Sequence, residues 1–222
     1  MKIAFYDAHQ YDIKYFSEAN KDFNYQIDFF DFRLNEKTSD SADGYDCVCV
    51  FINDTLNKDV LIKLSLYGIK LIVLRCAGYN NINLEEAEKL QITVLRVPDY
   101  SPHAIAEHGI SLLLALLRKI PQSYIRTKSG NFSQDGLIGK NLFGKTAGII
   151  GTGRIGRVMA EILKGFGMKV ICYDPFPDNE WALQKGFTYV NINEIFKQSD
   201  VLTFHCPLTD ENQKMINEES GL

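Results

Sequence analysis

The chain has 222 residues, 45% of them apolar and 23% charged, with a formal net charge of −4; this is enough for a buried core and for more than one domain. The acidic balance argues against nucleic-acid binding, and no apolar run is long enough to span a membrane. The start has no signal-peptide architecture and the five cysteines form no C-x-x-C pair, so we expect a reducing, cytoplasmic compartment.

Residues 1–98 alternate short apolar runs with amphipathic segments. This pattern is typical of an α/β unit built on a parallel sheet. The expected strands cover residues 2–6, 26–32, 47–52, 71–74 and 93–95, and the expected helices cover residues 13–19, 59–67 and 84–90.

The segment R-C-A-G-Y-N-N-I-N, residues 75–83, follows the expected strand 71–74. Open α/β sheets place their ligand crevices at this end of their strands. Gly78 allows a backbone conformation that directs N–H groups at an anion such as a carboxylate. An ordinary turn with an asparagine that caps the next helix accounts for the spacing equally well.

The residues after 98 connect this unit to a second region. Pro98 and Pro102 bracket this connection, a long helix is expected over residues 104–119, and residues 123–145 are polar and read as an irregular excursion. His103, Glu107 and His108 match neither H-E-x-x-H nor H-x-x-E-H, so we expect no metal site.

The most informative segment is G-T-G-R-I-G, residues 151–156. It follows an apolar run at residues 146–150 that suits a buried parallel strand. In a dinucleotide-binding turn, Gly151 permits the tight bend, Gly153 lets the backbone approach the pyrophosphate, and Gly156 lets the helix pack closely on the strand. The helix N-terminus then offers N–H groups and partial positive charge to the phosphates.

The surroundings of the glycines strengthen this interpretation. Apolar residues recur at helical spacing over residues 155–166, a second strand is expected over residues 169–173, and Asp174 ends it. A carboxylate there accepts hydrogen bonds from the adenosine ribose and repels a 2′-phosphate, and no Arg or Lys follows in residues 175–178 to offset it. We therefore predict NAD rather than NADP. The alternative is a glycine-rich turn that binds nothing. It is disfavoured because the strand, the helix, the second strand and the terminal acid are all in place.

Several motifs together resemble one known family. They are residues 75–83, the segment V-P-D-Y-S-P-H-A-I-A-E-H at 97–108, the glycine motif, and H-C-P-L-T at 205–209, which follows an expected strand at 201–204. They are similar to the D-isomer-specific 2-hydroxyacid dehydrogenases, and within that family to the bacterial fermentative D-lactate dehydrogenases, along the whole chain.

The resemblance implies two Rossmann-like α/β domains with parallel sheets. Residues 1–98 would be the N-terminal part of a flavodoxin-like substrate domain. Residues 99–222 would be an NAD-binding domain, incomplete in this chain, whose segment 104–145 forms the arm of a homodimer.

The resemblance also assigns residues to sites. Those implied for the substrate are Arg75, Ala77, Gly78 and Tyr100. Those implied for the cofactor are Gly151, Gly153, Arg154, Ile155, Gly156, Asp174, Pro175, Cys206, Pro207 and Asn212. We interpret His108 and His205 as structural residues rather than catalytic ones.

The family implies the reduction of pyruvate to D-lactate with NADH. Another 2-keto acid, such as glyoxylate or hydroxypyruvate, and an NAD-sensing module without catalysis remain as alternatives. The family's catalytic Arg, Glu and His would lie beyond Leu222, so none is expected in this chain. We therefore expect these 222 residues to be truncated and to have little or no activity.

Overall fold

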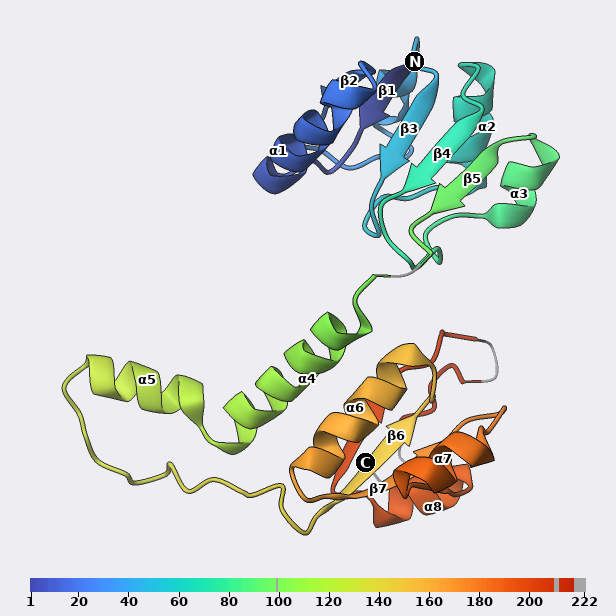
Figure 1. The fold of residues 1–222 in the computed structure, drawn as a ribbon. Helices are drawn as coiled ribbons and strands as arrows, with labels where there is room; N and C mark the ends of the chain where they lie inside the picture. The colour runs from blue at the N-terminus through green and yellow to red at the C-terminus, as the bar shows by residue number, and fades with distance from the viewer. Residues whose placement is uncertain (99, 210–211, 218–222) are drawn as a thin grey trace. The chain divides into compact units, whose positions relative to one another are not determined.

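The computed structural model describes residues 1–98, 100–209 and 212–217. The chain divides into two compact units, Met1–Tyr100 (unit 1) and Ser101–Leu222 (unit 2), which Figure 1 shows in the blue-to-green and green-to-red parts of the colour scale. The division expected from the sequence lies between residues 98 and 99, and residue 99 itself is outside the described residues.

Unit 1 contains, among its described residues, a five-stranded sheet in the order β2-β1-β3-β4-β5, with every pair parallel. The strands are β1 (Lys2–Phe5), β2 (Gln26–Phe29), β3 (Cys47–Val50), β4 (Leu71–Leu74) and β5 (Thr93–Arg96). This is the flavodoxin-like order. The central strand β3 is buried at every position, which explains why it reads as an uninterrupted apolar run.

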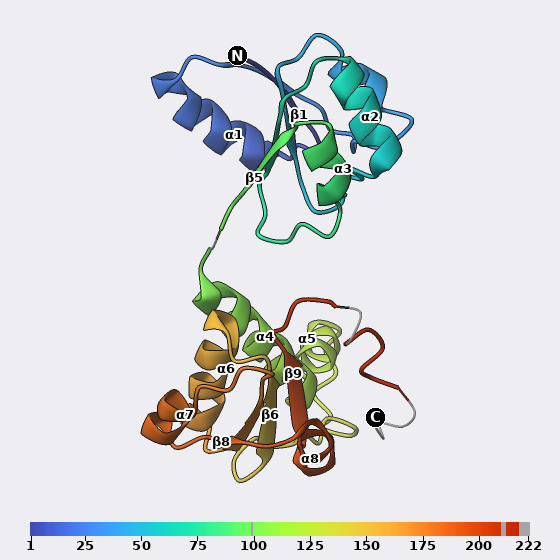
Figure 2. The ribbon, with the colours of Figure 1, turned by 90° about the vertical axis from the view of Figure 1, so that its right-hand side faces the viewer.

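Helices cover both faces of this sheet. They are α1 (Gln10–Ala19), α2 (Lys58–Leu66) and α3 (Leu84–Lys89), with short 3₁₀ helices η1 (Asn20–Asp22) and η2 (Ser39–Ala42). In Figure 2, α1 lies on one face and α2 and α3 on the other. The main core includes Leu61 and Leu64 of α2 packed against Val48 and Ile72 of the strands.

Unit 2 contains, among its described residues, a four-stranded parallel sheet in the order β8-β7-β6-β9. The strands are β6 (Thr146–Ile150), β7 (Lys169–Tyr173), β8 (Thr188–Tyr189) and β9 (Val201–Phe204). Taken in chain order, this arrangement corresponds to 3-2-1-4, the first four positions of the Rossmann order. The order reverses between β6 and β9, and Rossmann folds bind dinucleotides at that point. The parallel α/β sheets of both units confirm the predicted fold class.

The helices of unit 2 are α4 (Pro102–Leu117), α5 (Ile120–Lys128), α6 (Arg154–Gly165), α7 (Asn179–Lys185) and α8 (Ile192–Gln198). Residues of α4, α6 and α7 share one core with Ala147 and Ile149 of β6. Ile195 of α8 packs with Ile150 in a second cluster. Side chains alternate across a strand, so the two clusters lie on opposite faces of the sheet. Within the described residues, no helix has both the length and the apolar character that a membrane crossing requires.

The expectation that residues 123–145 are irregular is wrong for the first part of that segment. Helix α5 covers Ile120–Lys128, while residues 129–145 contain no helix or strand. Lys119 has a φ of 57° and separates α4 from α5, and Pro121 lies in the first turn of α5. A proline in that position starts a helix rather than ending one, because its missing N–H is not needed there.

Candidate functional site

The turn between β6 and α6 is built around Gly151. Its φ is 89°, in the left-handed region that glycine adopts without strain. A Cβ added there would lie 2.7 Å from the carbonyl oxygen of His205 and 2.9 Å from the nitrogen of Cys206. Glycine is therefore needed for the bend and also for the close passage of the chain that leaves β9.

The other two glycines of the motif, Gly153 and Gly156, differ in the space around them. A Cβ on Gly156 would overlap the carbonyl oxygen of Gly151, so α6 could not stay this close to the turn. A Cβ on Gly153 would meet no atom of the described residues within 4 Å, so none of them requires glycine there. Open space beside Gly153 is what a turn needs if a pyrophosphate is to approach its backbone.

Within the described residues, no side chain caps the N-terminus of α6. Its N-cap residue is Gly153, which has no side chain to accept a hydrogen bond from the first turn. By contrast, three other helices have a polar N-cap residue whose side chain accepts from a backbone N–H of the first turn. These N-caps are Asn57 for α2, Asp178 for α7 and Asn191 for α8. Arg154 and Ile155 are the first two residues of α6. The first N–H groups and the helix dipole favour negative charge at this end.

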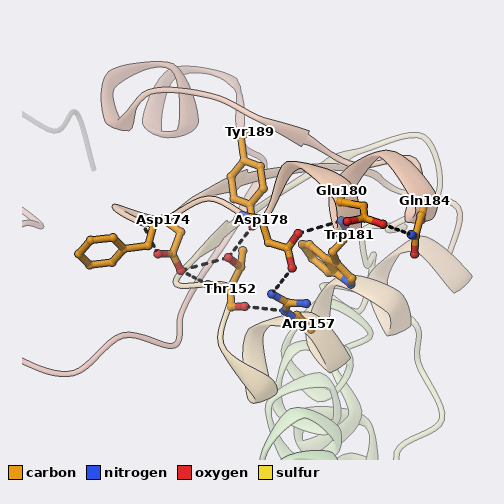
Figure 3. Close-up of polar contacts among 9 residues, drawn as sticks. Thr152, Arg157, Asp174, Asp178, Glu180, Trp181, Gln184 and Tyr189 are labelled. Atoms are coloured by element: carbon orange, nitrogen blue, oxygen red, sulfur yellow. Dashed lines mark hydrogen bonds and ion pairs between the residues drawn. The ribbon is translucent and has the colours of Figure 1, made fainter.

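Asp174 follows β7 and points back to the glycine turn (Figure 3). Its Oδ2 accepts from the backbone N–H of Thr152 at 2.7 Å and from the Thr152 hydroxyl at 3.0 Å, and its Oδ1 accepts from the N–H of Phe176 at 2.9 Å. Burial by itself would raise the pKa of Asp174. The hydrogen bonds from Thr152 and Phe176 and the charge of Arg157 outweigh burial, so this pKa lies below its usual value. The carboxylate is therefore charged at neutral pH.

Arg157 joins the turn to the start of α7 (Figure 3). Its Nε donates to the carbonyl oxygen of Thr152 at 2.9 Å, its Nη2 pairs with Oδ2 of Asp178 at 2.8 Å, and its guanidinium lies 4.8 Å from the ring centroid of Trp181. Hydrogen bonds from the backbone N–H of Trp181 and from Arg157 lower the pKa of Asp178. Arg157 thus holds the turn and α7 together while its own charge is largely neutralised.

Sequence reasoning missed Thr152, Arg157 and Tyr189. The Thr152 hydroxyl lies 2.7 Å from that of Tyr189, which follows it by 37 positions. Thr152 stands between two glycines of the motif and could have been noticed there. Tyr189 belongs to the two-residue strand β8, and so short a strand gives no periodic signal.

The remaining residues implied for the cofactor lie at the edges of this site. Pro175 is exposed directly after Asp174. Cys206 and Pro207 are exposed in the segment that leaves β9, and Asn212 closes that segment by donating to the carbonyl oxygen of Pro207 at 2.7 Å. The ring Nε2 of His205 hydrogen-bonds with the Thr203 hydroxyl at 2.7 Å, and burial lowers the pKa of this histidine.

The loop after β4 in unit 1 presents Ala77 and Gly78. Within the described residues, neither backbone N–H donates a hydrogen bond. Gly78 has no positive φ, and an added Cβ would make only an ordinary contact with Cδ1 of Ile52 at 3.6 Å. The conformation of Gly78 therefore does not depend on glycine, and within the described residues the N–H groups of Ala77 and Gly78 have no protein acceptor.

Arg75 does not extend into solvent. Its side chain is 8% exposed, its Nη2 donates to the carbonyl oxygen of Asp7 at 2.6 Å, and its Nε lies 3.5 Å from Oδ1 of Asp12. The guanidinium lies 4.4 Å from the ring centroid of Phe5 and 5.0 Å from that of Phe51. Arg75 was implied as a substrate residue, but here its charge is used inside unit 1.

Other side chains hold the loop after β4 in place. Nη1 of Arg96, at the end of β5, donates to the carbonyl oxygen of Ala77 at 3.1 Å. The amide of Asn81 donates to the carbonyl oxygens of Phe51 at 2.9 Å and Asp54 at 3.0 Å. Tyr100, the last residue of unit 1, is 52% exposed. Its side chain is accessible, as a pocket-lining role would require.

Comparison with known proteins agrees with this geometry. Residues 110–220 match the family model described as D-isomer specific 2-hydroxyacid dehydrogenase, NAD binding domain. The chain is 48% identical over 218 residues to a D-lactate dehydrogenase of Escherichia coli, covering 98% of this chain and 66% of that protein. It is 48% identical over 220 residues to a 2-hydroxyacid dehydrogenase homolog of Haemophilus influenzae, covering 99% of this chain and 66% of that protein.

Solved structures give the same result. The apo-structure of D-lactate dehydrogenase from Escherichia coli matches with a TM-score of 0.90 at 48% identity, covering 99% of this chain and 69% of that one. A D-lactate dehydrogenase from Aquifex aeolicus, complexed with NAD and lactic acid, matches with a TM-score of 0.84 at 34% identity, covering 99% and 65% of the two chains.

The fold and the glycine site therefore define a Rossmann-type NAD-binding protein. More particularly, the chain belongs to the D-isomer specific 2-hydroxyacid dehydrogenase family, and residues 110–220 carry that family's NAD-binding domain. The chain spans about two thirds of the length of the curated relatives that it matches, 66% in the two cited above.

Proposed function

We propose that the protein is an NAD-dependent dehydrogenase of D-2-hydroxy acids, with pyruvate and D-lactate as its substrate pair. One observation carries this proposal: two glycines of the turn are required sterically, the third is not, and a charged Asp174 lies beside them. Gly151 and Gly156 are required by the fold, whereas a Cβ on Gly153 would meet none of the described residues within 4 Å. A dinucleotide would therefore be held with its pyrophosphate at the N-terminus of α6 and its adenosine ribose at Asp174.

The substrate class is supported by the loop after β4. The N–H groups of Ala77 and Gly78 are without partners among the described residues and would hold the carboxylate that all 2-keto acids share. Tyr100 would line the same pocket. Arg75 would act indirectly by fixing the base of the loop, because its guanidinium is buried. NADH, when bound, supplies the hydride that reduces the keto carbon.

The cofactor part of the proposal is tested by titrating the chain with NADH and NADPH, using calorimetry and the emission of Trp181, its sole tryptophan. We expect NADH to bind at least about tenfold more tightly, a difference of about 1.4 kcal/mol. Comparable affinities, or no binding of NADH by folded protein, would overturn it. The substrate is tested separately by turnover of pyruvate, glyoxylate and hydroxypyruvate, using a protein of the full length of the relatives, because little or no activity is expected of these 222 residues. A preference for either of the last two would replace pyruvate as the substrate.

We also propose that the protein is a homodimer formed through unit 2. Support comes from apolar side chains that stand exposed along α4, α5 and residues 129–145. They are Leu112, Leu116, Ile120, Tyr124, Ile125, Phe132, Ile138 and Phe143. Exposed apolar side chains gathered along one segment are typical of an interaction site in a folded protein.

Sedimentation velocity tests the dimer. Ile125 on α5 is 67% exposed, and Ile125→Asp should convert a dimer to a monomer. Leu183 on α7 is 82% exposed and lies outside this surface, so Leu183→Asp should leave the dimer intact. A monomeric wild-type protein, or equal effects of the two variants, would contradict the proposal.

We propose that the protein is cytoplasmic, because its cysteines suit a reducing compartment. All five are free, and four of them are buried. Burial raises the pKa of Cys49 and of Cys172 to about 12, so these thiols stay protonated and unreactive at neutral pH. The location of a tagged protein in fractionated cells tests this assignment.

A further inference from the structure

A chain of hydrogen bonds runs from the start of α7 to the carboxylate of Asp174 (Figure 3). The backbone N–H of Asp178 donates to the hydroxyl oxygen of Tyr189 at 3.3 Å. The hydroxyls of Tyr189 and Thr152 lie 2.7 Å apart, and the Thr152 hydroxyl lies 3.0 Å from Oδ2 of Asp174. The segment after β7, strand β8 and the turn between β6 and α6 are thus linked in one chain of hydrogen bonds that ends at Oδ2 of Asp174.

The direction of each proton in this chain follows from the chemistry of the groups. An ionised carboxylate can only accept, so the single proton of the Thr152 hydroxyl is directed at Asp174. The oxygen of Thr152 must then accept the proton of Tyr189. Tyr189 in turn accepts the N–H of Asp178. Each hydrogen bond therefore has one direction, and the carboxylate at the end of the chain is held in one orientation.

We propose that Tyr189 is a positioning residue for cofactor choice, acting through Thr152 on the carboxylate of Asp174. This inference rests on the proposed NAD-dependent function, and it adds a specificity-determining residue that lies outside the glycine motif. Tyr189 would not touch the reacting atoms. It would keep Asp174 in the orientation that accepts a ribose hydroxyl and repels a 2′-phosphate.

The acceptor capacity of Asp174 supports this role. An ionised carboxylate offers about four lone-pair sites. Two N–H groups, from Thr152 and Phe176, and the Thr152 hydroxyl are directed at them. Because Oδ2 receives both groups of Thr152, the remaining capacity lies on Oδ1, where a ribose hydroxyl can donate. Rotation of the carboxylate would break this division between its two oxygens.

The hydroxyl of Tyr189 can be removed without disturbing the rest of the residue. Tyr189 pairs with Cys172 in register, two residues before Asp174, and the N–H of Val190 donates to the carbonyl oxygen of Cys172 at 2.9 Å. The Tyr189 ring lies 6.5 Å from that of Trp181. Backbone pairing and ring packing are therefore retained in Tyr189→Phe, which removes only the hydroxyl.

The ratio of the NADPH to the NADH dissociation constant tests the proposal, measured by calorimetry on the full chain. In Tyr189→Phe the ratio should fall about three- to tenfold, the effect of one well-placed hydrogen bond. NADH should bind less tightly while NADPH binds as before or better. A residue with only a structural role would weaken both nucleotides equally, and that result, or an unchanged ratio, would overturn the proposal.

A double variant tests the route through Thr152. Thr152→Val removes the hydroxyl at constant shape, and the ratio in Thr152→Val with Tyr189→Phe should equal that in Thr152→Val alone. Additive effects would show that Tyr189 acts by another route and would overturn the proposal. Thr152→Ser should restore the wild-type ratio. If Tyr189→Phe does not fold, the Thr152→Val and Thr152→Ser pair decides, and equal ratios in that pair reject the proposal.

Tyr45→Phe is the matched control, because the Tyr45 hydroxyl donates to Oδ2 of Asp28 at 2.8 Å in unit 1. It removes a similar hydrogen bond away from the glycine turn and should leave the ratio unchanged. A wild-type chain that binds neither nucleotide would refute the proposed function itself. A wild-type chain that prefers NADH, with an unchanged ratio in Tyr189→Phe, would refute the role of Tyr189 alone.

Discussion

The loops that carry the two candidate sites, residues 151–156 in unit 2 and residues 75–81 in unit 1, both follow the carboxyl end of a buried parallel strand. They are fixed by different means. In unit 2 the backbone itself sets the shape, because Gly151 needs its φ of 89° and Gly156 leaves no room for a Cβ. In unit 1 the loop is fixed by side-chain hydrogen bonds to distant segments, from Arg96 to Ala77 and from Asn81 to Phe51 and Asp54.

This difference decides what a sequence can reveal. A turn shaped by sterics demands glycine at fixed spacings, so the spacing is itself informative. A turn shaped by distant side chains has no such signature, because residues many positions away supply its hydrogen bonds. The glycine motif could therefore be interpreted directly, whereas the loop at residues 75–83 remained ambiguous until the family resemblance was considered.

The largest effect is expected for Gly156→Ala. Alanine in a helix interior is normally favoured over glycine by about 1 kcal/mol. Here the added methyl group would overlap the carbonyl oxygen of Gly151 and force α6 away from β6. Overpacking against backbone should dominate, and we expect a net loss of about 3 kcal/mol or more from unit 2. Urea unfolding followed by Trp181 emission measures it.

Gly153→Ala is the matched control for this variant. Its Cβ would meet no described atom within 4 Å, so stability should fall by less than about 1 kcal/mol, mainly from a poorer N-cap. NADH binding should nevertheless be lost, because the methyl group occupies the space beside the turn. Equal stability losses in the two variants would contradict the division of roles among the glycines.

The next effect concerns unit 1, where side chains hold the loop. Asn81→Ala removes both hydrogen bonds to the carbonyl oxygens of Phe51 and Asp54. Leaving such groups unpaired costs about 1–3 kcal/mol. Circular dichroism should show an earlier transition while Trp181 emission, which reports on unit 2, is unchanged. Asn80→Ala, at an exposed neighbour, should have almost no effect, and a similar loss there would count against the assignment.

Several elements could be predicted to the residue from the sequence alone. The strands at residues 71–74, 146–150, 169–173 and 201–204 have the bounds expected of them, because each is a compact apolar run between polar residues or glycine. Helix α5 was missed because a proline in a first turn resembles a helix breaker. The burial of Arg75 was missed because its partners, Asp12 and two aromatic rings, come from separate segments.

The candidate site was predictable to the extent that it follows from the motif. Asp174 and the three glycines were named, but the hydrogen bonds that orient Asp174 were not. Tyr189 reaches Thr152 only because β8 pairs with β7 in one register. Pairing between distant strands is decided by tertiary packing, which local patterns do not encode.

Lowering the pH should change the stability of the two units in opposite directions through one carboxyl group in each, Asp178 in unit 2 and Asp54 in unit 1. In unit 2, hydrogen bonds from Trp181 and Arg157 lower the pKa of Asp178. The unfolded chain then binds more protons than the folded chain, so the stability from Asp178 is present above the ordinary carboxyl pKa and is lost as the pH falls through the folded pKa. In unit 1, burial raises the pKa of Asp54. The folded chain then binds more protons than the unfolded chain, so the stability from Asp54 declines as the pH rises from the ordinary carboxyl pKa through the raised one.

Asp178→Asn separates these contributions, because asparagine caps a helix as well as aspartate does. Trp181-monitored stability should depend less on pH below about 4 in this variant than in the wild type. The transition of unit 1 should keep its pH dependence. An unchanged acid profile of unit 2 would mean that the pairing of Asp178 with Arg157 contributes nothing to folding.

The smallest effect is expected for Gly78→Ala, and its sign is informative. Gly78 has no positive φ, and its nearest neighbour to a new Cβ is the end of the Ile52 side chain at 3.6 Å. Alanine there restricts the unfolded chain without straining the folded one, so unit 1 should be unchanged or more stable by up to about 1 kcal/mol. Urea unfolding of unit 1 by circular dichroism measures this change. A loss of more than about 1 kcal/mol would mean that this loop, like the turn in unit 2, is shaped by its glycine. The contrast between the two units would then be withdrawn.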